Sequence, residues 1–106
     1  MADIVWTSPA FLVLEALPQE IAFGIIRLVD RFEDFPKMGS PLLQASRSHE
    51  KYRQLIFRRR FRAIYEFDES ENCVYILNLQ NCRQKFPTAR QLRRNRLAED
   101  DDLSLK

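Results

Sequence analysis

The hydrophobic period of the chain changes once, near Tyr52, and this change limits the possible folds more than any other feature. Before it, five apolar residues recur at the i, i+4, i+7, i+8, i+11 spacing of one buried helical stripe: Ile21, Ile25, Leu28, Val29 and Phe32. After it, apolar and polar residues alternate as they do in strands. A chain whose first half favours helices and whose second half favours strands is expected to form an α+β domain.

The first half predicts a strand followed by a two-helix hairpin. Residues 4–6 form a short β-branched and aromatic run. The Thr7-Ser8 pair before Pro9 supplies a hydroxyl N-cap for a helix over residues 9–16. Pro18 disfavours helical geometry at the preceding residue, so it ends this helix and can open a second one over residues 19–35. Two prolines and a glycine then predict a loop.

The second half predicts three strands, at residues 53–57, 61–67 and 73–79, joined by loops short enough for an antiparallel meander. In the second strand one buried face is expected to carry Phe61, Ala63, Tyr65 and Phe67. The third strand is expected to be buried on both faces, with one face made by Tyr75, Leu77 and Leu79. A short basic helix over residues 90–97 follows.

These elements predict a small antiparallel or mixed sheet, made of the N-terminal strand and the three-stranded meander. The two-helix hairpin is expected on one side, with a short C-terminal helix after the sheet. A chain of 106 residues is large enough for one core. We expect a single domain over residues 1–97 and an acidic, flexible tail over residues 98–106.

Membrane, secreted and metal-binding classes are not favoured. The longest near-apolar run, residues 9–17, is far shorter than the ~20 residues that span a bilayer, and an acid stands at residue 3 where a secretory signal would be basic. Cys73 and Cys82 flank a predicted strand, roughly 30 Å apart, which is too far for a disulfide. With one histidine and no ligand spacing, we expect no metal or cofactor and a cytoplasmic protein.

Charge is strongly segregated along the chain, although the net charge is only +2. Residues 51–96 hold twelve basic and four acidic side chains, a net charge of +8. Residues 1–50 and 97–106 each carry a net charge of −3. The basic block indicates a polyanionic partner, with nucleic acid as the first candidate, and a solvated basic face is the alternative.

Four local motifs occur in a recognisable order: Thr7-Ser8-Pro9-Ala10-Phe11, Leu17-Pro18, Phe35-Pro36 with Gly39-Ser40-Pro41-Leu42, and Phe61-Arg62-Ala63-Ile64-Tyr65-Glu66. Together with the element order, they resemble the RelE/ParE superfamily of toxins from bacterial type II toxin–antitoxin systems. The resemblance covers about residues 3–90 and implies a cognate antitoxin protein as partner.

The family contains two activities on one fold, so the fold cannot choose between them. RelE-like members cut mRNA in the ribosomal A site, and ParE-like members poison DNA gyrase. The leading hypothesis is a toxin that inhibits translation as a ribosome-dependent mRNA endoribonuclease, with ribosome and mRNA as partners. The alternatives are a gyrase inhibitor without catalytic chemistry of its own and a non-toxic basic nucleic-acid-binding module.

The resemblance also suggests catalytic residues. Arg62 falls at the family's strand arginine, where its planar fork suits a scissile phosphate, although it could instead pair with Glu66 or another acid. After the last strand the family carries a cluster of His, Lys, Arg and Tyr, which Arg83 and Lys85 match in character. No His or Tyr stands there, so His49 and Glu50 are the substitute proton carriers, or they are solvated loop residues.

Other arginines are candidates for nucleic-acid contacts. Arg53 falls near a lysine that RelE-like enzymes use and would bind phosphate. A tight turn is expected to carry three adjacent guanidiniums, those of Arg58, Arg59 and Arg60. They repel one another unless an anion lies near, which favours phosphate contact, and the alternative is a solvated turn. The last helix continues the basic surface with Arg90, Arg93, Arg94 and Arg96, of which Arg90 and Arg94 are the chosen candidates.

Overall fold

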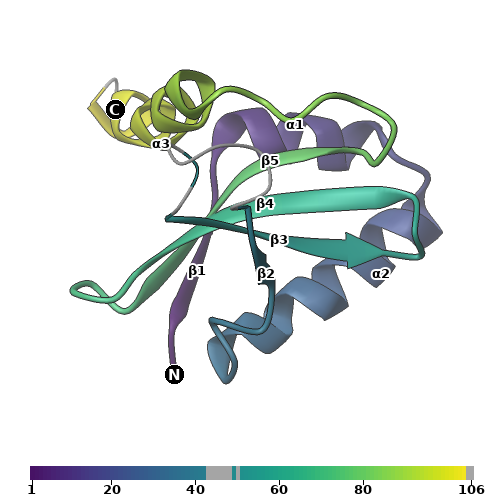
Figure 1. Cartoon of the computed structure of the whole chain (residues 1–106), viewed down its shortest axis with the longest axis horizontal. Helices are drawn as coiled ribbons and strands as arrows, with labels where there is room; N and C mark the ends of the chain where they lie inside the picture. Colours follow the sequence, from purple (N-terminus) through teal and green to yellow (C-terminus); the bar gives the residue numbers. More distant parts are fainter. Residues whose placement is uncertain (43–48, 50, 105–106) are drawn as a thin grey trace.

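The chain folds into a mixed sheet with helices on both faces, and the computed structural model describes residues 1–42, 49 and 51–104 (Figure 1). Its elements in chain order are β1 (Asp3–Trp6), α1 (Ser8–Ala16), α2 (Gln19–Asp30), η1 (Arg31–Glu33), β2 (Ser40–Pro41), β3 (Tyr52–Phe57), β4 (Phe61–Asp68), β5 (Cys73–Asn81) and α3 (Ala89–Ser104). The strands lie in the order β1-β5-β4-β3-β2. The predicted α+β class is confirmed.

The three-stranded meander is present as predicted. β3 pairs antiparallel with β4, and β4 pairs antiparallel with β5. β1 lies parallel to β5 at one edge of the sheet, which makes the sheet mixed. At the other edge, β2 pairs two residues with β3, in a stretch where the two prolines and the glycine predicted only a loop.

The helix hairpin covers one face of the sheet. Ala10 and Leu14 of α1 and Ile25 and Val29 of α2 pack in one buried cluster with the predicted face of β4, including Tyr65. Thr7 precedes α1 as expected, but its side chain does not cap the helix. Its hydroxyl instead donates to the Ile76 carbonyl at 2.7 Å, so it fastens the start of α1 to β5.

The opposite face is covered by α3, and a bulge in β5 divides the apolar residues of that strand between the two cores. Leu92 of α3 packs with Tyr52, Ile64 and Leu77. Where β4 and β5 change register, Ile64 pairs with Asn78 and Tyr65 with Ile76, so Leu77 is the extra residue. Leu79 therefore joins the first core, and the expected face of Tyr75, Leu77 and Leu79 is wrong.

Two helices end elsewhere than expected. α2 stops at Asp30, because residues 31–33 tighten into a 3-10 turn before the loop. α3 continues to Ser104, beyond the expected end at residue 97, since neither glycine nor proline follows to break it. The division into a domain of residues 1–97 and a tail of residues 98–106 stays a prediction.

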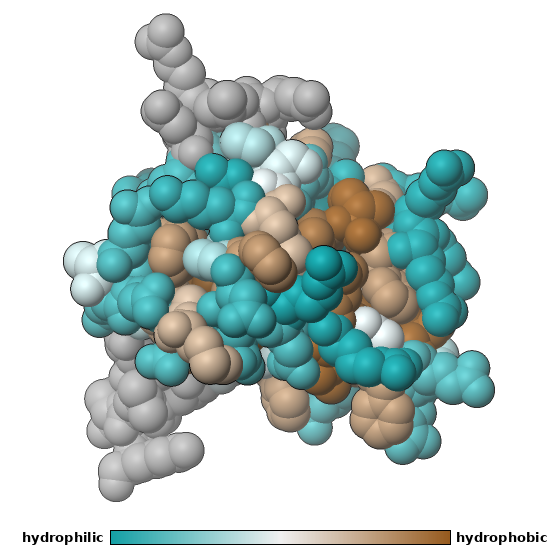
Figure 2. All heavy atoms as spheres, turned by 90° about the horizontal axis from the view of Figure 1, so that it is seen from below, coloured by the Kyte–Doolittle hydropathy of each residue, from teal (hydrophilic) through white to brown (hydrophobic). Residues whose placement is uncertain are grey.

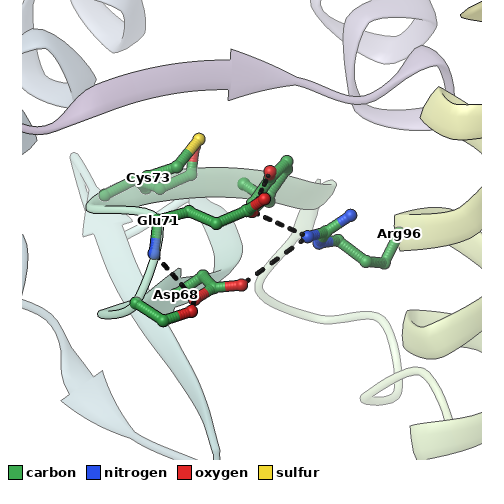
Figure 3. Close-up of polar contacts among 7 residues, drawn as sticks. Asp68, Glu71, Cys73 and Arg96 are labelled. Carbon is green, nitrogen blue, oxygen red and sulfur yellow. Dashed lines mark hydrogen bonds and ion pairs between the residues drawn. The ribbon is translucent and has the colours of Figure 1, made fainter.

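Arg96 holds α3 against the β4–β5 hairpin rather than extending the basic surface. Its guanidinium lies 3.4 Å from the Tyr75 ring centroid and 3.4 Å from a carboxylate oxygen of Glu71. It also lies 3.9 Å from Asp68, and Figure 3 shows the side chain reaching toward both acids. The prediction that Arg96 belongs to a basic surface is therefore wrong.

Within the described part of the chain, no helix has the length and apolar character needed to cross a bilayer. Cys73 and Cys82 are both free thiols, as predicted from their separation.

Candidate nucleic-acid interface

The candidate site is built around Arg62, which β4 places opposite Gln80 of β5. The side chain is on the face covered by α3, and the residue is only 9% exposed. Its guanidinium lies over the Phe86 ring, 4.1 Å from the centroid. Long hydrogen bonds run from Nη1 to the Gln84 carbonyl at 3.5 Å and from Nη2 to the Cys82 carbonyl at 3.4 Å.

Arg62 carries its charge into this environment without a counter-ion among the described side chains. The ion pairs among the described side chains do not include it, so the alternative pairing with Glu66 is not formed there. Its Nε is buried and has no hydrogen-bond partner in the part of the chain that the structure describes. A buried guanidinium with weak carbonyl contacts lacks a neutralising charge and has a free N–H donor. A bound anion would supply both the opposite charge and a hydrogen-bond acceptor.

The β3–β4 turn precedes this position and carries two more arginines at its centre. Arg58 and Arg59 have φ values of 52° and 57°, and the Arg60 amide donates to the Phe57 carbonyl at 3.0 Å. Two central residues with positive φ define a type I′ turn, which normally uses Asn-Gly. This sequence holds the strained geometry with arginine at both central positions.

A hollow of about 380 Å³ joins this turn to the loop after β5, and it is lined by Arg59, Arg60, Asn81, Cys82 and Arg83. Cys82 is one of its lining residues, and the Cys82 carbonyl is the acceptor for Arg62 Nη2. The fold therefore gathers four of the predicted residues, Arg59, Arg60, Arg62 and Arg83, around one short loop.

That loop is fixed by its own hydrogen bonds. The Asn81 carbonyl accepts from the Gln84 amide at 3.0 Å, and the Asn81 side chain accepts from the Arg83 amide at 2.9 Å. Gln80 Nε2 donates to the Lys85 carbonyl at 2.9 Å. Gln80 and Phe86 were missed as site residues. The register of β4 against β5 places Gln80 opposite Arg62, and the fold of the loop after β5 brings the Phe86 ring under its guanidinium.

His49 is buried, with 7% of its surface exposed, and its Nε2 lies 2.8 Å from the Pro87 carbonyl. A carbonyl only accepts, so Nε2 carries the proton. This contact ties the segment before β3 to the loop before α3. Glu50 lies outside the described residues. The Lys85 side chain is exposed, and its carbonyl supports Gln80.

Four of the predicted nucleic-acid residues are not gathered at Arg62. The Arg58 guanidinium lies 5.0 Å from the centroid of the Phe57 ring, which packs against the core on the side of the helix hairpin. Arg53 pairs across the sheet with Tyr65, and its guanidinium donates to the carbonyls of Gly39 at 2.8 Å and Lys37 at 3.3 Å. Arg53 therefore lies on the side of the helix hairpin, away from the face that carries Arg62. Arg90 and Arg94 are exposed on α3.

The tyrosines near the sheet do not provide a base. Burial raises the pKa of Tyr52, and the nearby Glu66 charge raises it further. Burial also raises the pKa of Tyr75, whose hydroxyl donates to Glu71 at 2.7 Å. Both phenols therefore keep their protons at neutral pH.

The sequence matches no protein-family model and no curated protein. Solved structures do match its fold. A chain of the RelBE2 toxin–antitoxin complex from Mycobacterium tuberculosis is 21% identical with a TM-score of 0.63, covering 78% of this chain and 93% of that one. The isolated E. coli RelE toxin is 9% identical with a TM-score of 0.65, covering 89% and 98%. The intact E. coli RelBE complex gives 9% identity and a TM-score of 0.63, covering 79% and 100%. The chain therefore has the fold of the RelE toxins.

Proposed function

We propose that this protein is the toxin of a type II toxin–antitoxin pair and that it stops translation by cleaving mRNA on the ribosome. The observation that carries the proposal is Arg62, a nearly buried cation without a described counter-ion, beside a hollow lined by three further arginines. The RelE fold supports the choice of a toxin, since chains of this fold occur in the toxin–antitoxin complexes described above.

The chemistry that suits this site is internal transesterification of RNA. The 2′-oxygen attacks the adjacent phosphorus, the bond from phosphorus to the 5′-oxygen breaks, and the products carry a 2′,3′-cyclic phosphate and a 5′-hydroxyl. Negative charge develops on the phosphate oxygens, where the planar fork of Arg62 can donate two hydrogen bonds. Arg59, Arg60 and Arg83 would hold the flanking phosphates.

Binding of a phosphate at Arg62 replaces contacts that are long and weak. The two carbonyl acceptors lie 3.4 and 3.5 Å from the guanidinium nitrogens, whereas a charge-assisted bond to phosphate is typically about 2.7–2.9 Å. The exchange therefore favours the RNA-bound state.

Proton transfer is the least complete part of this site. His49 uses its Nε2 proton on Pro87, Phe86 has no hydroxyl, and Lys85 is suited to donating rather than accepting a proton. We propose that the ribosome orients the 2′-oxygen and the phosphate in line, an effect worth several kcal/mol, about 7 or more in favourable cases. Free RNA is then expected to be a poor substrate.

The same incompleteness favours a second candidate, inhibition of DNA gyrase by binding alone. A toxin that acts by binding needs no general base, so the hydroxyl-free Phe86 against Arg62 is compatible with it. A non-toxic basic nucleic-acid-binding module is the third possibility, and it predicts no effect on growth.

An antitoxin partner is part of the proposal. The outer surface of α1 is unusually apolar for an exposed helix, with Phe11 46%, Leu12 66% and Val13 36% exposed. On the face seen from below, apolar side chains also gather among hydrophilic ones (Figure 2). An amphipathic, acidic antitoxin segment would cover apolar helix residues and neutralise the basic loops.

Expression in a bacterial host tests the toxin, with Arg62→Ala as the site variant and Arg27→Ala, an exposed arginine of α2, as the matched control. Wild type and Arg27→Ala should arrest growth and produce cut mRNA, and co-expression of the cognate antitoxin should rescue growth. Arg62→Ala should lose about 10²–10³ of the cleavage rate. Growth arrest with gyrase-dependent DNA breaks and intact mRNA would move the assignment to the second candidate, and normal growth with soluble wild type would refute both.

A further inference from the structure

A groove of about 670 Å³ lies beside Arg62, where α1, the end of β5 and the loop before α3 meet. Its lining includes Val13, Asn78, Gln80, Gln84, Phe86 and Gln91. Lys85 is its one charged lining residue among the described side chains, and no described acid lines it. Side-chain amides can hydrogen-bond a polar ligand, an aromatic ring can stack on a planar one, and the single cation can contact an attached anion. This lining therefore suits a planar polar ligand that is neutral or attached to an anion.

Gln80 gives this groove a fixed hydrogen-bond acceptor. The residue is 7% exposed, and its Nε2 donates to the Lys85 carbonyl. Because a carbonyl cannot donate, the orientation of the Gln80 amide is determined, and Oε1 is the atom left over. Oε1 is buried and has no hydrogen-bond partner among residues 1–42, 49 and 51–104. A buried acceptor of this kind requires an N–H or O–H donor.

A matching donor lies next to it. Arg62 is the direct cross-strand partner of Gln80, and its Nε is also buried without a partner. Side chains at directly opposed positions on one sheet face have Cβ atoms about 4.5–5.5 Å apart. Arg62 itself does not line the groove, so Gln80 Oε1 is the acceptor that the groove offers, and it suits the N–H donors on the edge of a nucleobase.

We propose that this groove binds one unpaired nucleobase of the RNA and that Gln80 Oε1 accepts a hydrogen bond from the edge of that base. The choice of RNA rests on the proposed function. Phe86 both contacts Arg62 and lines the groove, so its ring adjoins the phosphate position and offers a stacking surface to the base. Lys85 stands at the rim, where it can approach the phosphate of the same nucleotide.

Titration of the purified protein with small probes tests the inference without requiring catalysis. The probes are the four ribonucleoside 5′-monophosphates and ribose 5-phosphate, followed through the side-chain amide signals of Gln80 and Asn78 by NMR. At least one nucleotide should bind on the order of five- to tenfold more tightly than ribose 5-phosphate, the effect of one hydrogen bond to a buried acceptor plus stacking.

Gln80→Leu should bring the nucleotides to within about twofold of ribose 5-phosphate, and Gln80→Met is a second variant of similar shape. Gln54→Leu is the matched control, because Gln54 Oε1 is likewise buried and without a partner but does not line the groove. Gln54→Leu should keep the full advantage of the nucleotide. Thermal unfolding verifies that each variant is folded.

Equal binding of all four nucleotides and ribose 5-phosphate, or an unchanged advantage in folded Gln80→Leu, would overturn the inference. An antitoxin peptide that shifts the Gln80 and Asn78 signals when no nucleotide does would also overturn it. A different experimental result would refute the proposed function while leaving this inference intact. Base-dependent binding with no mRNA cleavage on ribosomes leaves the groove assignment standing and removes the ribonuclease.

Discussion

Arg62 is retained at a position where a charge is unfavourable for stability. The residue is nearly buried, it forms no ion pair with a described side chain, and Nε has no hydrogen-bond partner. Transfer of an unpaired charge out of water disfavours the folded state, and stacking on Phe86 compensates only in part. A residue that lowers stability in this way is typical of a functional site.

Arg62→Met should therefore separate stability from function. Methionine fills a similar volume, can pack against Phe86 and carries no charge, so we expect the free energy of unfolding to rise by about 1 kcal/mol. Urea unfolding measures this, and the toxicity assay should show loss of activity in the same variant. A loss of more than about 2 kcal/mol would mean that the carbonyl contacts and the stack serve the fold instead.

Tyr65 predicts how stability depends on alkaline pH. It is fully buried and its hydroxyl accepts from the Gly39 amide at 3.0 Å. Burial raises the pKa of Tyr65 above its ordinary value, so the folded protein keeps this proton after the unfolded chain has lost it. Its contribution is fully present below pH ~10 and is lost as the pH rises from there toward the folded pKa.

We expect the free energy of unfolding to fall above pH ~10, with Tyr65 contributing up to about 1.4 kcal/mol per pH unit. Tyr65→Phe should make this fall shallower, and at pH 7 it should cost about 1 kcal/mol because the Gly39 amide loses its acceptor. Urea unfolding at pH 7 and at stepwise higher pH measures both effects. An identical alkaline slope in the variant would contradict the assigned role of Tyr65.

At the scale of elements, the β3–β4 turn holds the clearest backbone strain. Arg58 and Arg59 both adopt left-handed backbone geometry, which costs an L-residue with a side chain roughly 1–2 kcal/mol. Glycine or asparagine would adopt it more easily. The proposed function offers a reason for arginine here, because the charge of this turn would contact phosphate.

Replacing the two central residues by Arg58→Asn and Arg59→Gly should stabilise the protein by about 1–2 kcal/mol, since this pair favours a type I′ turn. The same variant should bind ribosomes more weakly, with a shallower dependence on salt concentration. Arg58→Lys with Arg59→Lys is the control that keeps the charges and should not gain stability. Stronger or unchanged ribosome binding by the Asn-Gly variant would exclude the turn from the interface.

The elements were predictable where one physical rule dominates. The helical stripe of α2 and the alternation in β4 follow from burial of one face, and both are present. The bulge at Leu77 was not predictable, because it depends on how β5 meets β4 and not on its own alternation. β2 was missed because two residues, one of them a proline, carry no strand pattern. The contact of Thr7 with β5 was not predictable either, because its acceptor, the Ile76 carbonyl, lies 69 positions away in the sequence.

At the scale of the whole molecule, the sequence predicted the basic block but not which of its members converge. Arg59, Arg60 and Arg83 line one hollow beside Arg62. Arg53 and Arg96, from the same basic block, instead bind carbonyls of the helix-side loop and acids of the β4–β5 hairpin. Long side chains choose their partners by tertiary position, so charge along the chain predicts a polyanion partner without locating its site.

The most direct measurement of the central claim is cleavage of one defined mRNA on purified ribosomes, compared with the same mRNA carrying a single 2′-deoxynucleotide at the cut position. We predict that the wild type cuts the all-ribose mRNA, leaves a 2′,3′-cyclic phosphate and spares the deoxy position, and that Arg62→Met cuts neither. An uncut all-ribose mRNA, or cleavage that persists at the deoxy position or in folded Arg62→Met, would contradict the account.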